Sequence, residues 1–138
     1  MGDTVQVTAS AHLFKGLSDV GDVIELHDSA GSKYRVLITA YQSSTAVTGK
    51  LEHAMPMAMR RAAISTWGIG RREITAGAHL EGVTVQVVSD GVIQATQAVV
   101  GGVITLVVPG VQVHVGRAYT SDLRTLPLGV PNTPGYGQ

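Results

Sequence analysis

The chain has 138 residues, with ten basic and ten acidic side chains, no cysteine, and only 14% charged residues. This length fits one ordinary domain or two small β modules with a buried core. The balanced charge gives no broad patch for nucleic acid or anionic membrane, and the lack of cysteine excludes disulfides, thiolate zinc sites and thiol catalysis.

The N-terminal region, residues 3–52, has the pattern of a compact β module. Four short runs are rich in Val, Ile, Thr or Tyr: TVQVTAS, DVIELHD, KYRVLITAYQ and STAVTGKL. Turn formers separate them, among them Gly16, Gly21 and the DSAGS cluster at residues 28–32. The pattern predicts four strands in a barrel-like module.

Residues 53–76 are expected to form a short, partly helical connector. Ala, Met and Arg favour a helix over residues 57–64, with Pro56 at its first turn, and the WGIG sequence at residues 67–70 predicts its end. Two basic doublets flank the chain's single Trp, and Arg and Trp are enriched at interface hot spots. The candidate protein contact therefore consists of Arg60, Arg61, Trp67, Arg71 and Arg72.

The same doublets around an aromatic residue are compatible with single-stranded nucleic acid binding on a small β-barrel. One Trp and one Phe make a poor stacking platform, however. We favour a connector whose arginines pair with acidic neighbours.

Residues 77–128 predict a second β module. Val83, Val85 and Val87 alternate with polar residues, as a half-buried strand requires. Three turn signals at nearly regular spacing divide the region into four strands, which predicts a meander or small barrel. The residues expected to shape its turns are Gly82, Asp90, Gly91, Gly101, Gly102, Pro109 and Gly110. Residues 129–138 have no periodicity and are expected to be loose.

The expected fold class is thus all-β, with a barrel-like N-terminal module and a C-terminal strand meander joined by the short connector. No basic stretch followed by an apolar run opens the sequence, so no signal peptide is visible and synthesis in a cytoplasm is expected. No apolar run approaches the roughly 18 residues that span a bilayer. We expect no membrane span.

A catalytic centre needs convergent side chains, and the sequence offers none. The five histidines are dispersed without metal-ligand spacing. His79 and Glu81 would share a strand face, as an acid-base or metal pair or as a local polar contact. The DSAG at residues 28–31 is interpreted as a turn, and the GIGRRE at residues 68–73 lacks the third glycine of a dinucleotide loop. The sequence therefore predicts no catalytic residue, no cofactor and no metal.

The order of motifs resembles the tail nozzle family of short-tailed bacteriophages, the tail tubular protein B-like structural proteins. In that family a strand opens with His-Leu-Glu-Gly, reaches an Asp-Gly turn, returns through a Gly-rich turn to Ile-Thr-Leu, and continues into Val-Gly-Leu-Pro-Tyr-Thr-Ser and Thr-Leu-Pro. Here these motifs correspond to residues 79–82, 90–91, 101–106, 115–121 and 125–127. Arg117-Ala118 stands where the family has Leu-Pro.

The first half is similar to the family's Thr-Ala-Ser, Phe and Asp-Val-Gly opening. Members of the family are longer chains, so we expect this sequence to be a portion of one or a short relative. The resemblance implies a virion tail protein: a subunit of a hexameric ring, joined to tail adaptor or portal proteins. DNA would pass through its channel as non-specific cargo.

Two other function classes stay open. A carbohydrate-binding module would need exposed aromatic platforms, for which the candidates are Tyr34, Tyr41, Trp67, Tyr119 and Tyr136. A cell-wall hydrolase would need paired carboxylates in a cleft. Its candidates are mostly in predicted turns: Asp19, Asp22, Glu25, Asp28, Glu52, Glu73, Glu81, Asp90 and Asp122.

Overall fold

The computed structural model describes residues 2–124, and the structural statements that follow concern these residues. The chain is all-β, as predicted, and its helical segments are a one-turn helix and two 3-10 turns. The strands are β1 (Thr4–Thr8), β2 (Val23–His27), β3 (Lys33–Ser43), β4 (Ala46–Leu51), β5 (Trp67–Thr75), β6 (Thr84–Ser89), β7 (Val92–Ala98), β8 (Val103–Gly110) and β9 (Val113–Gly116). The helical segments are η1 (Leu17–Asp19), α1 (Met57–Arg60) and η2 (Ala78–Leu80).

The N-terminal module is an antiparallel sheet in the order β1-β4-β3-β2-β5. Its four predicted strands are all present. Alternate apolar residues of β2, β3 and β4 point to one face, and Phe14 and Met55 cover that face from the flanking loops. The resulting core consists of Phe14, Ile24, Leu26, Val36, Ile38, Val47, Leu51 and Met55.

The C-terminal module packs the three-stranded sheet β7-β6-β9 against β8 and the second half of β5. Its separate core consists of Val85, Val87, Val99, Ile104 and Leu106. Side-chain amides bridge the facing edges of β7 and β8: Gln94 accepts from the Val107 N–H at 3.2 Å and donates to the Val108 carbonyl at 3.0 Å. Gln97 accepts from the Thr105 N–H at 3.1 Å, so glutamines take the place of a backbone ladder here.

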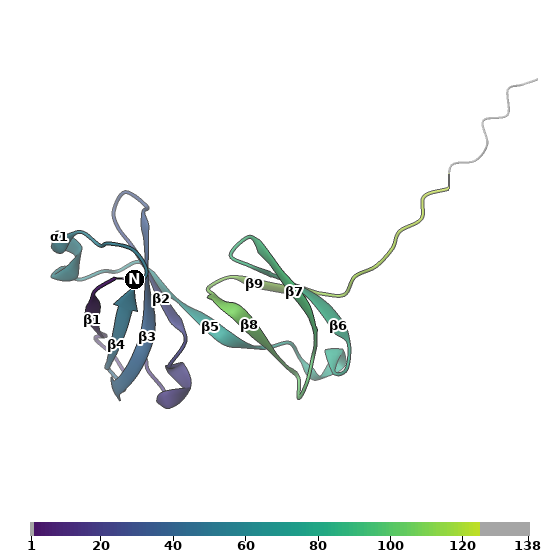
Figure 1. The fold of residues 1–138 in the computed structure, drawn as a ribbon, viewed down its shortest axis with the longest axis horizontal. Coiled ribbons are helices and arrows are strands. Elements are labelled where there is room, and N and C mark those ends of the chain that lie inside the picture. The colour runs from purple at the N-terminus through teal and green to yellow at the C-terminus, as the bar shows by residue number, and fades with distance from the viewer. Residues whose placement is uncertain (1, 125–138) are drawn as a thin grey trace, which may run out of the picture.

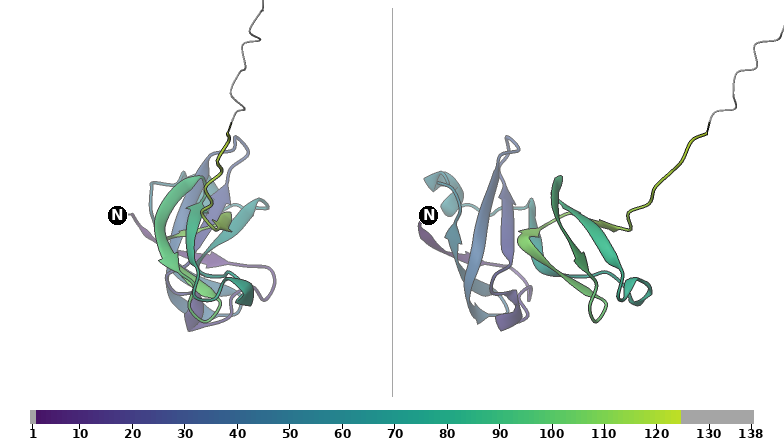
Figure 2. Two further views of the ribbon diagram at one scale, coloured as in Figure 1. Left: turned by 90° about the vertical axis from the view of Figure 1, so that its right-hand side faces the viewer. Right: turned by 45° about the vertical axis from the view of Figure 1, so that its right-hand side comes forward.

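Strand β5 belongs to both modules, as Figure 1 shows. Its first four residues pair with β2, and the stretch from Arg71 to Thr75 pairs with β8. One six-stranded sheet, β1-β4-β3-β2-β5-β8, therefore runs through the molecule. Figure 2 shows the two modules side by side with β5 leading from one to the other.

This strand corrects the expected course of residues 53–76. The helix is a single turn, Met57–Arg60, and does not reach residue 64. A helix over residues 57–64 would be too short to be stable by itself, and no residue of the observed turn is buried to stabilise it by packing. The prediction that the WGIG stretch ends the helix is wrong, since the helix ends at Arg60 and WGIG begins β5. Pairing with β2 outweighs the weak strand preference of its two glycines.

Two of the three predicted turns in the C-terminal module lie where expected. Asp90 and Gly91 have φ of 49° and 82°, the two positive angles of a tight hairpin between β6 and β7. Gly101 and Gly102, with φ of 63° and 72°, turn the chain into β8. The third turn lies later than predicted, after Gly110, because Gly110 still pairs with Arg71 of β5.

Replacing Gly91 by Val is expected to lower the free energy of unfolding by about 1–2 kcal/mol, because a β-branched residue is strained at positive φ. No atom lies within 4 Å of an added Cβ, so the cost comes from the backbone alone. Gly116→Val is the matched control, since Gly116 has the same open space without a positive φ. Urea denaturation compares the two variants. Equal stability of Gly91→Val and wild type would contradict the assigned turn.

Candidate functional site

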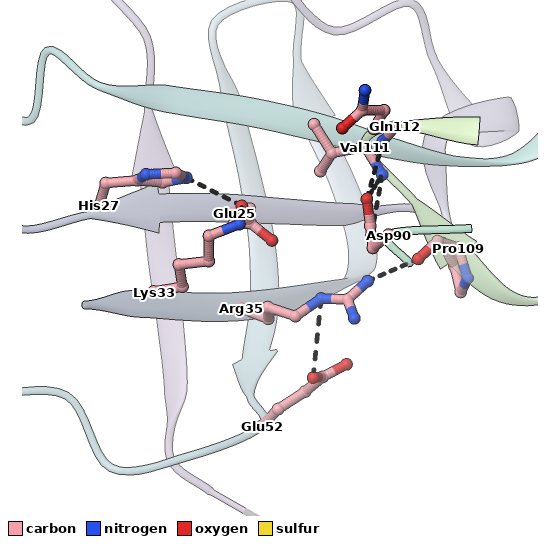
Figure 3. Close-up of polar contacts among 9 residues, drawn as sticks. All are labelled: Glu25, His27, Lys33, Arg35, Glu52, Asp90, Pro109, Val111 and Gln112. Carbon is pink, nitrogen blue, oxygen red and sulfur yellow. Dashed lines mark hydrogen bonds and ion pairs between the residues drawn. The ribbon is translucent and has the colours of Figure 1, made fainter. Parts of the chain in front are cut away.

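The candidate site is the junction between the modules, where the end of β8 and the turn after it cover the outer face of the N-terminal sheet (Figure 3). We define the junction by Glu25, Arg35, Gly68, Gly70 and residues 109–112. Glu25 lies opposite both Arg35 of β3 and Gly68 of β5, so these three positions share one face of the sheet. That face is opposite the core face, which carries Ile24 and Leu26.

Two glycines of β5 allow the close approach at the junction. A Cβ built at Gly68 would lie 2.8 Å from Val111 Cγ1. A Cβ built at Gly70 would lie 3.1 Å from the carbonyl carbon of Gly110 and 3.3 Å from the Val111 nitrogen. Because these residues are two apart on one strand, their missing side chains leave a shallow seat for Gly110 and Val111.

Arg35 ties the two modules together with its side chain. Its Nη2 donates to the Pro109 carbonyl oxygen at 2.5 Å, and its Nε lies 3.8 Å from a carboxylate oxygen of Glu52. The Nε is buried and has no hydrogen-bond partner among residues 2–124. Figure 3 shows the guanidinium between Glu52 on one side and Pro109 on the other.

The carboxylate of Glu25, on the same face of the sheet, also has polar partners. The Glu25 side chain is 7% exposed, and its Oε1 lies 2.8 Å from His27 Nε2 and 3.1 Å from Lys33 Nζ. Burying a carboxylate without partners is costly, so these two donors stabilise the charge beside the junction. Glu25 therefore supports the fold.

A second clamp, formed by Arg71, holds β5 to the N-terminal module. Arg71 Nη1 donates to Asp19 at 2.6 Å and to Asp22 at 2.8 Å, and the Arg72 backbone N–H donates to Asp22 at 2.8 Å. The backbone N–H groups of Lys15 and Gly16 also donate to Asp19. The side chains of Asp19 and Asp22 are 2% and 6% exposed, so Arg71 neutralises two buried carboxylates from the middle of the shared strand.

This clamp predicts a pH dependence of stability. Burial raises the pKa of Asp19, but hydrogen bonds from Lys15, Arg71 and Gly16 outweigh burial and hold this pKa below its ordinary value of 3.8. A carboxylate with a depressed pKa stabilises the fold above its unfolded pKa, and this contribution is lost as the pH falls through the folded value.

The stability difference between wild type and Asp19→Asn is therefore expected to be full above about pH 4 and to shrink as the pH falls further. Urea midpoints measured from pH 6 downward provide the test. A difference that stays constant across this range would show that the charge of Asp19 does not contribute.

Two acidic residues at the predicted turns accept hydrogen bonds from backbone N–H groups. Glu81 accepts from Gly101 at 3.0 Å and from Gly102 at 2.6 Å, which fixes the turn before β8. Asp90 accepts from Val111 at 3.2 Å and from Gln112 at 2.8 Å, which fixes the turn at the junction. Neither alternative for His79 and Glu81 describes what is found within residues 2–124, because Glu81 bonds to a turn about 20 residues further along the chain and no hydrogen bond joins it to His79.

Replacing Glu81 by Gln is expected to lower the free energy of unfolding by about 1 kcal/mol, because an amide loses the charge and one of the two acceptor oxygens. Amide exchange at Gly101 and Gly102 should become faster. Glu73→Gln serves as the control, since Glu73 is exposed on β5 and makes no ion pair within residues 2–124. Unchanged exchange at both glycines in Glu81→Gln would contradict this role.

The predicted contact residues lie in different places. Arg60 ends α1 and pairs with Asp3 at 2.7 Å, and Arg61 is exposed directly after it. Trp67 begins β5 and is 46% exposed, whereas Arg71 is in the clamp and the Arg72 side chain is exposed. The expected pairing with acidic residues thus holds for Arg60 and Arg71, with partners far away in the sequence.

The remaining turn glycine, Gly82, follows η2 with a φ of 73°. Asp28 accepts from the Ala30 and Ser32 N–H groups, so DSAG forms the expected turn. The loose tail predicted at residues 129–138 and the candidate Tyr136 lie outside the described residues. The sequence does not predict the roles of Arg35 at the junction or of Asp19 and Asp22 in the Arg71 clamp, because the contacts to Pro109 and to Arg71 each span more than 45 residues of the chain.

Within residues 2–124, no three or more His, Asp or Glu side chains gather as a metal site would require. None of the described helices has the length and apolar character needed to cross a membrane. No protein-family model matches the chain, and a search of curated proteins finds no match.

Proposed function

We propose that the chain is a structural protein of a bacteriophage tail, part of a ring-forming nozzle subunit that lines the channel through which DNA leaves the virion. The observation that carries the proposal is the shared strand β5 with its clamps. Two small cores joined by one continuous strand, by Arg71 and by Arg35 make a stiff element that can transmit load between neighbouring subunits.

The motifs that resemble the nozzle family support the proposal through their roles in the fold. Glu81 and the Gly101-Gly102 turn are one hydrogen-bonded unit, and the Asp90-Gly91 hairpin also fixes the turn at the junction. A scaffold without chemistry needs such shape-determining residues more than it needs reactive ones. In this proposal the protein has no enzymatic activity.

The neutral charge balance also suits the proposed channel. A wall with strong positive charge would hold DNA through phosphate contacts, whereas a chain with ten basic and ten acidic residues has no net attraction for it. Tail adaptor or portal proteins are the proposed neighbours of the ring, in the virion tail after synthesis in the bacterial cytoplasm.

No observation within residues 2–124 favours the carbohydrate-binding alternative. Tyr34 and Tyr41 pack against the first core, Trp67 lies at the start of β5, and Tyr119 lies beyond the last strand. Aromatic residues on these separate elements do not form a single described platform.

The test of the proposed function is the mass of the protein in solution, measured by light scattering over a concentration series and combined with electron microscopy of the largest species. We expect a closed oligomer of one fixed size that appears as a ring and does not retain double-stranded DNA at physiological salt. A strict monomer over the whole series would overturn the proposal.

A further inference from the structure

The N-terminal module has an apolar groove of about 520 Å³ on its core face, beside β1. It is lined by β1 and the loop after it, by the end of α1 and the residues that follow, and by Trp67. The floor includes the core residues Ile24, Leu26 and Val36. The groove therefore lies between β1 and the start of β5, the two outer strands of this module's sheet.

The groove runs along a free strand edge. Within residues 2–124, β1 pairs with β4 alone. The Ala9 N–H donates to the Thr45 carbonyl and the Asp3 carbonyl accepts from the Leu51 N–H, so the odd-numbered residues of β1 bond to β4. The backbone groups of Thr4, Gln6 and Thr8 consequently point to the open side, where an added strand can pair with them.

The opposite end of the molecule carries a segment suited to such a site. Residues 117–124 are all exposed and make no hydrogen bond within the described part of the chain. Tyr119 and Leu123 are 89% and 90% exposed. In an extended strand they would share one face with Ser121, while Ala118, Thr120 and Asp122 would lie on the other. One face is thus mainly apolar and the other mainly polar.

The position of this segment favours binding to the groove of another chain over binding to the groove of its own chain. Figures 1 and 2 show it leaving the C-terminal module on the side away from β1 and α1. Residues 125–138 follow it in the sequence without a single Asp, Glu, Lys, Arg or His, so these residues bring no charged side chain toward an apolar groove.

We propose that residues 118–123 of a second copy of the chain occupy the β1 groove, pairing with the outer edge of β1 and burying Tyr119 and Leu123. Such a contact joins two different surfaces of one chain, head to tail, and a repeated head-to-tail contact closes into a ring when its rotation permits. The inference deepens the proposed function and rests on its ring of identical subunits.

Two variants and their controls test the contact from both sides. Gln6→Pro removes the outward N–H of β1 without removing a bond to β4, and Gln6→Ala controls for the lost side-chain bond to Gln42. Tyr119→Asp combined with Leu123→Asp places charge on the apolar face of the segment. Ala118→Asp combined with Thr120→Asp is the control on the other face.

Light scattering of each variant, and of the two disrupted variants mixed, is the experiment. We expect each disrupted variant to be monomeric, with self-association weakened at least about tenfold, while both controls assemble as wild type does. The mixture should form a one-to-one complex, because it contains one intact groove and one intact segment. If both disrupted variants assembled as wild type does, this inference would be overturned, but the proposed ring-forming function would not. A monomeric wild type would overturn the proposed function as well.

Discussion

Replacing Arg71 by Ala is expected to lower the free energy of unfolding by about 3 kcal/mol, because the change leaves two buried carboxylates without their cation. The side chain of Arg71 is 32% exposed, so water reaches part of the site and the loss lies at the lower end for a broken buried pair. Urea denaturation at neutral pH measures the effect.

The control for Arg71→Ala is Arg72→Ala on the same strand, whose exposed side chain makes no ion pair within residues 2–124. Replacing the two unpaired carboxylates by amides should recover part of the lost stability. Arg71→Ala combined with Asp19→Asn and Asp22→Asn is therefore expected to be more stable than Arg71→Ala alone. An Arg71→Ala protein as stable as Arg72→Ala would contradict the clamp.

Replacing Gly70 by Val is expected to cost about 2–3 kcal/mol by forcing the modules apart. The new Cβ would meet the backbone of Gly110 and Val111 at 3.1–3.3 Å, and its two methyl groups would come closer still. Backbone atoms held in the β5–β8 ladder cannot rotate away as a side chain end could. Val is favoured in strands, so a loss cannot come from strand preference.

The size series Gly70→Ala and Gly70→Val separates crowding from any other effect, because the loss should grow with the added methyl groups. Glu73→Val, at an exposed position of the same strand, controls for placing Val on β5. Urea denaturation again gives the free energies. If Gly70→Val were no less stable than Glu73→Val, this result would contradict the close approach of the Gly110 and Val111 backbone to Gly70.

The two β modules could be predicted from the sequence because local signals agree there. Alternating valines, strand-favouring runs and Gly-rich turns each indicate the same elements, and the hairpin at Asp90-Gly91 needs only its own two residues. Such features depend on neighbours in the chain, which a single sequence displays directly.

The contacts at the junction could not be predicted, because they join residues that lie far apart in the sequence. Gly68 and Gly70 have the local signature of a helix stop, and their role emerges only when Val111 and Gly110 lie against them. Arg35 has no local sign that distinguishes it from a surface arginine, yet it reaches Pro109, 74 residues away. Pairing with β2 and β8 likewise makes a strand of β5 where local preference was weak.

The most direct test of the central claim, that both modules behave as one rigid unit, is hydrogen exchange by mass spectrometry at increasing urea. Peptides from β3 report the first core and peptides from β6 the second. We expect both sets to lose protection at the same urea concentration, as one cooperative unit does. Loss of protection in β6 well before β3 would show that the shared strand and its clamps do not couple the modules.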